Sequence, residues 1–463
     1  MCSSIQSVYT LRPSMRNSLQ LPRLVQKFGG TSVGSAAAIV RVGKIVASAR
    51  EKRPLVVVSA VGGVTNRLFA LGEAALAQRD FEHDFSALAE LHRTIQRELA
   101  VEVAEVEALL AELHDLLRGI ALIRERTPRT SDFLASFGER LSARIVAAHL
   151  NSIGVVARAV DAWDAGLLTD SRFGTARPLA ETPQRVRAAI GEIDAVAVVT
   201  GYIGRDSSGN ITTLGRGGSD YSAAIFGAAL GVDEIQIFTD VDGVLTADPR
   251  KVGHARLVPT LSFAEAAELA FFGAKVLHPA TMVPAVDADI PIRVLNTFEP
   301  DRSGTRVVAT LAAHQRAVKS IASKDPIVVV NVVAGEMMLQ FGFLEKIADV
   351  FARHEVVVDV IATSEVSVAL TTEAAIDLGP VVEELSRFAD VNVVRDVALV
   401  SVVGEELQSS TDFAARVFST LAELEIRLEM ISYGATRNNL SFVVSRARLG
   451  DVVAALHQRL FGA

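Results

Sequence analysis

Cysteine and long apolar runs are scarce in this 463-residue chain. Its one cysteine, Cys2, cannot form a disulfide within the chain and supplies no metal cluster, which favours a reducing compartment such as the cytoplasm. No apolar run approaches the roughly 18–20 residues that cross a bilayer. A basic excess is also missing: 46 basic and 54 acidic side chains give a net charge of −8, which disfavours nonspecific nucleic-acid binding. The composition is that of a soluble globular protein, and the length predicts about two to four domains.

The beginning of the chain lacks acidic residues, and Glu51 is the first one. Residues 1–23 contain five serines and three arginines, Arg12, Arg16 and Arg23. Such a composition is typical of an organellar transit peptide, but a flexible tail or an overlong start before Met15 would look the same. Because the segment has no clear amphipathic period, we interpret residues 1–23 as a flexible N-terminal extension.

Short apolar segments alternate with helical ones from residue 24 to about residue 308. The segments between residues 103 and 117 repeat valine and leucine at helical spacing, which indicates a helix in the core or at a subunit contact. Strands that alternate with helices predict a three-layer α/β fold with a mostly parallel sheet, in which ligands bind beyond the carboxyl ends of the strands. The clearest strands are expected at Leu55–Ser59, Ala195–Thr200, Glu234–Thr239 and Pro291–Leu295.

The C-terminal part of the chain contains an internal duplication. Two β-α-β-β sets begin at Ile327 and Val397, about 70 residues apart. Each set includes a strand after its first helix, expected at Val356–Ile361 and Ile426–Ile431, and each ends in a further helix. The duplication predicts two small α+β modules of ferredoxin-like type, at 318–396 and 397–463.

Two glycine-rich turns follow predicted strands. Lys27–Ser32 (KFGGTS) combines a cation, two glycines and two hydroxyls, which suits polyphosphate because glycine lets backbone N–H groups approach phosphate oxygens. It is not a P-loop, since the lysine precedes the glycines. Leu214–Asp220 (LGRGGSD) precedes a helix expected at Tyr221–Leu230, where backbone donors attract anions and Arg216 offers a fork for a carboxylate or phosphate. A plain turn with a surface lysine, and a capped loop with an incidental charge pair, are the alternatives.

Three further motifs place charged side chains beside glycine. Thr239–Gly243 (TDVDG) indicates a nucleotide-contacting turn, and it lacks the bidentate glutamate of a calcium loop. Lys275, in the sequence FGAKVLHP, reaches a phosphate or base in one interpretation and is a solvated surface lysine in the other. Phe137–Arg140 (FGER) is expected at a helix start, where Glu139 either faces an ammonium group or favours the helix dipole.

Together these motifs resemble those of the aspartate kinases, and the duplicated tail resembles the paired ACT modules of that family. The resemblance covers about residues 24 to 463 and is closest to the monofunctional, lysine-sensitive branch. It implies an amino-acid kinase domain at 24–308, followed by the two ACT modules. It also implies that ATP, with Mg²⁺, phosphorylates the side chain of L-aspartate to 4-phospho-L-aspartate, the first step in the biosynthesis of lysine, threonine and methionine. The six motifs are KFGGTS, FGE, TLGRGGSD, TDVDG, DPR at 248–250, and FGAKVLHP.

The resemblance also implies roles for individual residues. Lys27 and Asp220 are the expected catalytic residues, and no general base is needed because an aspartate side chain is ionised at neutral pH. No dedicated metal ligands are expected, since ATP oxygens and water hold most of the Mg²⁺. Leu245 replaces an aromatic residue common in the family, which predicts weaker nucleotide binding. The substrate-binding positions are Ser59, Thr65, Glu139, Arg216, Gly217, Gly218 and Ser219, with Glu139 for the α-ammonium and Arg216 for the α-carboxylate. The nucleotide-binding positions are Lys27, Phe28, Gly29, Gly30, Thr239, Asp240, Leu245, Asp248, Arg250, Lys275 and Val276.

The tail carries an expected site for a feedback effector. Gln340 and Val357 stand where the lysine-sensitive branch commonly has serine, so the effector stays open between lysine, threonine and none. Modules of this type usually pair through their sheets, which predicts a homodimer or homotetramer, and no nucleic-acid or membrane partner is expected. The effector positions are Met337, Gln340, Gly342, Phe343, Val358, Asp359, Thr363, Ser364 and Glu365.

Two other functions are compatible with parts of the sequence. An enzyme of the same fold could act on glutamate, acetylglutamate, carbamate or UMP, but such relatives generally lack the paired tail and the Lys27 hexapeptide. A catalytically silent amino-acid sensor would use only the tail, and the intact set of Lys27, Glu139, Arg216 and Asp220 argues against it.

Overall fold

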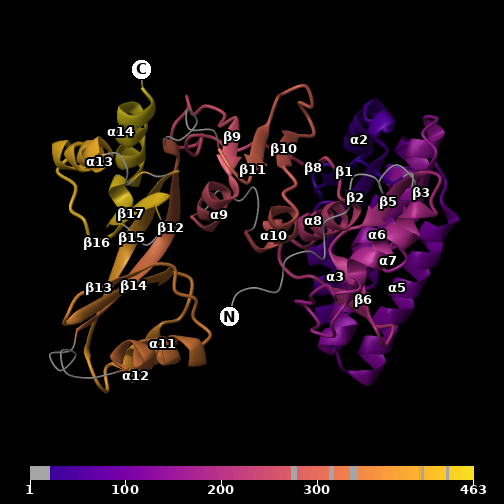
Figure 1. Ribbon diagram of the computed structural model, residues 1–463. Helices are drawn as coiled ribbons and strands as arrows, with labels where there is room; N and C mark the ends of the chain where they lie inside the picture. Colours follow the sequence, from indigo (N-terminus) through magenta and orange to yellow (C-terminus); the bar gives the residue numbers. More distant parts are fainter. Residues whose placement is uncertain are drawn as a thin grey trace. The chain divides into compact units, whose positions relative to one another are not determined.

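The computed structural model describes residues 21–272, 279–311, 318–333, 342–405, 407, 411–433 and 437–462. These residues form two compact units (Figure 1). The first unit contains the described residues up to Val244 and from Pro279 to Thr310, and the second contains the remainder. The segment from Leu245 to Phe272, which we expected in the kinase domain, therefore groups with the C-terminal residues. Within the described residues, no helix is long and apolar enough to span a membrane.

A mostly parallel sheet forms the centre of the first unit, as predicted. Its strand order is β3-β5-β2-β1-β8-β10-β11, and β11 pairs antiparallel with β10. The central strands β1 and β2 are buried along their whole length, which explains why their sequences are nearly continuous apolar runs. The strands are β1 (Leu24–Phe28), β2 (Pro54–Val58), β3 (Ala157–Val160), β5 (Val196–Thr200), β8 (Glu234–Thr239), β10 (Ile292–Asn296) and β11 (Thr305–Val308).

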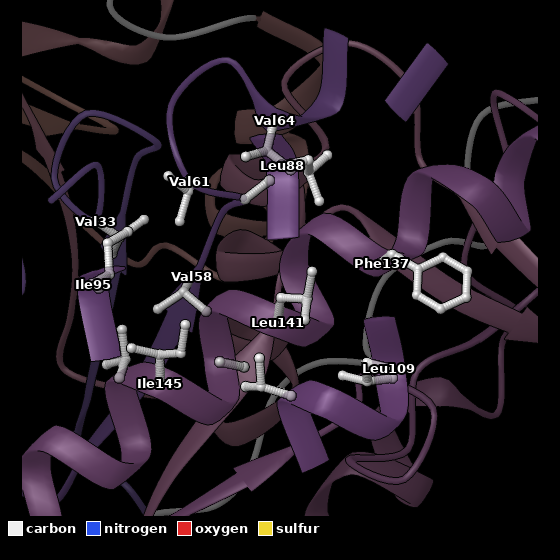
Figure 2. Packing of buried hydrophobic residues seen from close by; sticks show 14 of the residues in the cluster. Val33, Val58, Val61, Val64, Leu88, Ile95, Leu109, Phe137, Leu141 and Ile145 are labelled. Carbon is white, nitrogen blue, oxygen red and sulfur yellow. The ribbon is translucent and has the colours of Figure 1, made fainter. Parts of the chain in front are cut away.

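Helices cover both faces of this sheet, which confirms the three-layer arrangement. One face carries Phe28, Val58 and Val198, and these side chains join helices α2 to α6 in a single large core, part of which is shown in Figure 2. Helix α8 lies against the other face, and α7 and α10 pack on α8. The helices of this unit are α2 (Ala36–Ser48), α3 (Val64–Leu76), α4 (Glu82–Glu98), α5 (Ala104–Ile123), α6 (Pro128–Ser152), α7 (Thr182–Gly191), α8 (Gly218–Leu230) and α10 (Pro279–Asp287), with a short 3-10 helix at Arg50–Lys52.

Helix α6 begins earlier than we predicted. The Thr127 hydroxyl accepts a hydrogen bond from the Thr130 N–H at 3.1 Å, and Pro128 occupies the first helical turn, so the helix starts there. Phe137–Arg140 therefore lies in the middle of α6, and the prediction of a helix start at this motif was wrong. Glu139 is too far from the N-terminus for the helix dipole to explain its presence.

A single sheet also organises the second unit, with strand order β13-β14-β12-β15-β17-β16. Two separate cores pack on it, one centred on α11 and α12 and the other on α13 and α14. The elements are β9 (Thr260–Ser262), α9 (Phe263–Phe271), β12 (Val318–Val333), α11 (Phe343–Arg353), β13 (Ile361–Thr363), β14 (Ser367–Glu373), α12 (Gly379–Leu385), β15 (Asp390–Gly404), α13 (Thr411–Glu423), β16 (Met430–Tyr433), β17 (Asn439–Ser445) and α14 (Leu449–Phe461), with a 3-10 helix at Arg446–Arg448.

The two long strands β12 and β15 connect the two modules. The end of β12, Ile327–Val333, pairs with β14 and belongs to the first core. Its beginning pairs with the end of β15, and Ile321 belongs to the second core. A shift in the register between Lys324 and Ile327 separates these two parts. The modules are thus interleaved along the chain, whereas the duplication alone predicted two consecutive modules that meet near residue 396.

Two strands of these modules begin later than we predicted. We expected Val356–Ile361 and Ile426–Ile431, but the strands are β13 and β16, which start at Ile361 and Met430. The first of these segments is irregular and is not unpaired. The Asp359 N–H donates to the Thr371 carbonyl at 2.8 Å, and the Thr371 N–H donates to the Val360 carbonyl at 2.9 Å. Side-chain bonds interrupt the regular pattern between them, since the Val360 N–H donates to the Thr371 hydroxyl at 2.9 Å and the Thr372 hydroxyl donates to the Val357 carbonyl at 2.8 Å.

Candidate active site

The site begins where strand β1 ends. Because side chains alternate along a strand, Lys27 points away from the core that contains Phe28 and toward helix α8. There its Nζ lies 2.7 Å from the Asp220 Oδ1 in the first turn of α8. Both side chains are mostly buried, with 11% and 18% of their surface exposed. The structure thus brings together the two residues that we predicted to be catalytic.

The glycines after Lys27 allow two loops to approach each other closely. The Gly62 N–H donates to the Gly30 carbonyl at 3.0 Å, and a Cβ on Gly30 would lie 3.0 Å from the Ala60 carbonyl oxygen. The Ser32 hydroxyl, which we expected to face phosphate, is instead fully buried 2.6 Å from the Thr297 hydroxyl. This turn therefore offers a lysine and backbone groups at the site, while Ser32 connects two strand ends.

Glu139 extends from α6 toward the same place. Its Oε1 accepts a hydrogen bond from the Ala60 N–H at 3.2 Å, its Oε2 has no partner among the described residues, and the residue is 3% exposed. Burial raises the pKa of Glu139 to about 8, although the Ala60 N–H and the Lys27 charge both oppose the rise. Gly138 makes this approach possible, since a Cβ there would lie 2.6 Å from the Ala60 Cβ. A buried carboxyl without a full set of partners is suited to binding a cationic group.

The glycine-rich loop before α8 forms the opposite wall. Gly215 and Gly217 have φ angles of 80° and 70°, which glycine adopts readily, and the loop ends at the N-terminus of α8. Arg216 is exposed on this loop. A Cβ on Gly218 would lie 2.5 Å from the ring of Tyr202, so only glycine fits there without a shift. The loop therefore presents backbone N–H groups and one guanidinium.

These elements enclose a cavity of about 580 Å³. Its size is in the range usual for small-molecule sites. All seven predicted substrate-binding residues line it, as do Lys27, Gly30 and Asp220. The lining residues are Lys27, Gly30, Ser59, Ala60, Val61, Gly62, Gly63, Thr65, Asn66, Glu139, Gly174, Tyr202, Gly215, Arg216, Gly217, Gly218, Ser219 and Asp220.

Sequence analysis missed Asp132. It lies on α6 seven residues before Glu139, about two helical turns away on the same face. Its carboxylate accepts hydrogen bonds from the Thr213 N–H at 2.7 Å, the Thr213 hydroxyl at 2.9 Å and the Gly174 N–H at 2.9 Å. Burial raises the pKa of Asp132, and these donors oppose the rise. Asp132 thereby connects the loop that contains Gly174 to Thr213, the residue directly before the glycine-rich loop. The one available signal was a second acid at helical spacing from Glu139.

Tyr202 is the other missed residue. It lines the cavity with an unusual φ angle of 67°, and the Leu214 N–H donates to its carbonyl at 2.8 Å. It follows strand β5 in the connection to a small sheet of β4 (Leu168–Thr169), β6 (Ile203–Asp206) and β7 (Ile211–Thr213). Nothing in the sequence around Tyr202 distinguishes it from an ordinary buried tyrosine.

The predicted nucleotide-binding residues divide into three groups. Thr239 ends β8 and Asp240 follows it. Strand β8 is next to β1 in the sheet, and the Gly29 N–H donates to the Phe238 carbonyl at 3.2 Å. The Phe28 ring is fully buried and stacks on Phe238 with 4.8 Å between centroids, so only the backbone of Phe28 can face a ligand. Leu245, Asp248 and Arg250 belong to the second unit, where Arg250 pairs with Asp248 at 2.7 Å. Lys275 and Val276 lie outside the described residues.

The predicted effector residues that the structure describes lie in the second unit. The Asp359 carboxylate is almost fully buried and is already paired with the Lys324 Nζ at 2.8 Å. Ser364 shares a hydrogen bond with Ser367 at 2.7 Å, and Phe343 packs edge-on against Phe388. Gly342 precedes α11, and Val358, Thr363 and Glu365 lie around β13. Met337 and Gln340 are outside the described residues.

Comparison with known proteins agrees with this fold. A family model described as the amino acid kinase family matches residues 22–296, and an ACT domain model matches residues 400–460. Aspartokinase 1, chloroplastic, of Arabidopsis thaliana is 40% identical over 455 residues, which cover 94% of this chain and 80% of that protein. This chain belongs to the aspartokinase family. Lysine-sensitive aspartokinase 3 of Escherichia coli (strain K12) is 37% identical, with coverage of 95% of this chain and 99% of that protein.

Solved aspartokinase structures have the same fold. Escherichia coli aspartokinase III in complex with aspartate and ADP has a TM-score of 0.78 and 34% identity, and the match covers 95% of this chain and 99% of that one. The complex of the same enzyme with lysine and aspartate has a TM-score of 0.78 and 35% identity, with the same coverage. These comparisons confirm the aspartokinase assignment and the predicted fold class. The roles of individual residues stay predictions.

Proposed function

We propose that this chain transfers the γ-phosphoryl group of ATP to the side-chain carboxylate of L-aspartate, giving 4-phospho-L-aspartate. The observation that carries the proposal is the charge pattern of the 580 Å³ cavity. One cavity combines a buried carboxyl on Glu139, an exposed guanidinium on Arg216 and the Lys27–Asp220 pair. The Escherichia coli relative was solved with aspartate and ADP, which are one substrate and one product-side nucleotide of this reaction.

Recognition of the amino acid follows from these charges. The α-ammonium of aspartate pairs with Glu139, whose Oε2 has no partner among the described residues. The α-carboxylate pairs with Arg216 and with backbone N–H groups at Gly217 and Ser219, since the Gly218 N–H is bonded to the Gly215 carbonyl at 2.9 Å. Ser59 and Thr65 line the same cavity and add hydroxyl donors. The side-chain carboxylate then points toward Lys27.

Transfer of the phosphoryl group requires two anions to meet. The aspartate side chain is ionised at neutral pH, so no proton has to be removed from the nucleophile. Lys27 and the Gly30 backbone N–H stabilise the negative charge of the transferring group, which is the usual source of catalysis in phosphoryl transfer, whereas the Gly29 N–H is bonded to the Phe238 carbonyl. In the free enzyme Asp220 holds the Lys27 Nζ in place at 2.7 Å.

Mg²⁺ accompanies ATP in this proposal. Among the described residues no cluster of three or more His, Cys, Asp or Glu side chains could hold a metal alone. The Asp220 carboxylate is an oxygen ligand of the kind Mg²⁺ prefers, and it lines the cavity, so it fits a metal held mainly by ATP oxygens. Bound there, Mg²⁺ would neutralise charge on the phosphates. Thr239, Asp240, Leu245, Asp248, Arg250, Lys275 and Val276 are proposed to contact the nucleotide.

The second unit is proposed to bind a feedback amino acid. The Escherichia coli relative is named lysine-sensitive and was solved with lysine. In this chain the Asp359 carboxylate is already paired with Lys324, so a free lysine ammonium would have to displace an internal one. Initial rates with added lysine and threonine, for the wild-type enzyme and for Lys324→Met, test this. Lysine inhibition that is stronger in Lys324→Met supports the site, and no response to either amino acid in both enzymes contradicts it.

An ATP-dependent hydroxamate assay tests the proposed reaction most directly. We expect hydroxamate formation with aspartate and none with glutamate, because an extra methylene would move the carboxylate away from Lys27. Lys27→Ala should abolish the signal while the circular dichroism spectrum stays unchanged. Equal turnover of both acids, or near-normal turnover by Lys27→Ala, would refute the assignment. Light scattering of the same samples tests the proposed homodimer or homotetramer.

A further inference from the structure

A second cavity of the first unit shares no lining residue with the first one. It has a volume of about 740 Å³. Its floor is the α2-facing side of strands β1, β8 and β10, and its walls are helix α2 and the segment Phe298–Ser303. Gln26 is on the floor, whereas Lys27, the next residue, lines the first cavity. The two cavities therefore use opposite faces of the same sheet.

A row of polar side chains crosses this floor. Gln26, Gln236 and Arg293 are register neighbours on β1, β8 and β10. Gln26 Nε2 donates to Gln236 Oε1 at 3.0 Å, and Gln236 Nε2 donates to Glu234 Oε1 at 2.9 Å. Arg293 Nε donates to Glu234 Oε2 at 3.1 Å. Polar residues in a row are unusual on a face that the rest of the sheet covers with apolar side chains.

The row ends in an unpartnered acceptor. Glu234 is a carboxylate that only accepts, so it fixes the amide orientation of Gln236, and Gln236 in turn fixes that of Gln26. Gln26 Oε1 is left without a partner among the described residues, although the residue is only 2% exposed. Buried acceptors are nearly always satisfied, so this oxygen calls for an N–H or O–H donor from outside the row.

The rim of the cavity is positively charged. Five cationic and two acidic side chains line the cavity as a whole. Arg293 and Arg302 are paired with Glu234 and Asp242. Arg41, Lys44 and Lys52 form no ion pair within the part of the chain that the structure describes, and all three are exposed. Arg41 and Lys44 are three apart on α2, on one face of the helix, with Arg41 over the Phe298 ring.

We propose that this cavity binds a small organic anion, a phosphate or carboxylate that also carries a hydroxyl or amide donor. The anionic group lies at Arg41, Lys44 and Lys52, and the donor reaches Gln26 Oε1. The volume suits a small metabolite. The N-terminal residues of the chain itself do not fit this description, because residues 1–23 carry arginines and no acid.

Isothermal titration of the full-length enzyme tests the proposal, with aspartate and ADP present at saturation to fill the first cavity. The probes are glycerol 3-phosphate, citrate and inorganic phosphate. We expect saturable binding of glycerol 3-phosphate or citrate that is tighter than the binding of inorganic phosphate. Whichever of these two probes binds more tightly shows whether the site prefers a phosphate or a carboxylate. Lys44→Ala should weaken binding about tenfold or more, as expected for loss of one charge-assisted contact.

Three further variants complete the test. Gln26→Leu should remove the preference for the hydroxylated probes over inorganic phosphate, because it removes the unpartnered acceptor. Arg118→Ala, an exposed cation on α5 outside the cavity, should bind like the wild type. No binding of any probe, or equal binding by Lys44→Ala, would overturn the proposal. A changed oligomeric state in Lys44→Glu without probe binding would also overturn it, in favour of a contact between two copies of the chain.

Discussion

The raised pKa of Glu139 leads to a prediction about how aspartate binding depends on pH. Burial raises this pKa to about 8, so the carboxyl is largely protonated in the free enzyme at neutral pH. A protonated carboxyl cannot form an ion pair with the substrate ammonium. In its proposed role as the partner of the substrate ammonium, Glu139 must therefore lose a proton when aspartate binds, and this requirement predicts a weaker apparent affinity for aspartate at every pH below 8.

The size of the effect follows from the pKa. At pH 7 a group with a pKa of about 8 is ionised in about one molecule in ten. Because aspartate selects that minor form, its apparent affinity should be about tenfold weaker than at the plateau above pH 8, or about 1.4 kcal/mol. At pH 6 the loss should be about a hundredfold. The aspartate side chain stays ionised over this range and adds no pH dependence of its own.

Initial rates against aspartate concentration, at saturating ATP and from pH 6 to 8.5, measure this. We expect log KM to fall by about one unit per pH unit below pH 8. Glu139→Gln should have a KM that is higher than the wild-type plateau and independent of pH. Glu265→Gln makes the same change at another buried glutamate whose pKa is raised by burial, in the second unit, and should keep the wild-type profile. A wild-type KM that is constant from pH 6 to 8 would refute the reasoning.

Three further predictions concern the same wall of the site. Asp132→Asn places an amide opposite the N–H groups of Gly174 and Thr213 and should raise the aspartate KM about tenfold with an unchanged ATP KM. Asp206→Asn, which alters another buried carboxylate at the end of β6 and outside the cavity, should leave both KM values unchanged. The raised folded-state pKa of Glu139 makes the stability of the protein depend on pH. The stability that the protonated carboxyl contributes is complete below about pH 4.5 and is lost as the pH rises through 8. Glu139→Gln should therefore have a higher melting temperature than the wild type at pH 8.5 and a similar one at pH 5. Gly138→Val should lower the free energy of unfolding in urea by about 1–3 kcal/mol and should lower activity, because the valine side chain would collide with Ala60. An unchanged urea midpoint would contradict the close packing of Gly138 against Ala60.

Local sequence determined much of the kinase fold. The strands β2, β5, β8 and β10 were predicted within one or two residues, because central parallel strands are continuous apolar runs bounded by glycine, proline or polar residues. The motifs KFGGTS and TDVDG lie at the ends of the adjacent strands β1 and β8, so their convergence on one edge of the sheet could also be predicted, whereas LGRGGSD follows β7 of the small sheet. The start of α6 was missed because Thr127 and Pro128, which cap the helix, lie well before the FGE motif.

The modules of the second unit show where local reasoning fails. The duplication was visible, but the exchange of strand halves between the cores depends on the register of β12 against β15. Register is set by which side chains meet across a sheet, and no single segment contains that information.

The sequence by itself determined the family, the order of the elements and the charged residues that the site needs, since these depend on residue types and their spacing. Which side chains come into contact, and which of them are buried with a shifted pKa, depends on the tertiary structure. It buried Glu139 and so raised its pKa, joined Lys27 to Asp220 across about 190 residues, and brought Asp132 to the loop at Gly174 and to the end of β7 at Thr213. Burial and long-range contact depend on neighbours that are distant in the chain, and that is why the spacing of residues could not predict them.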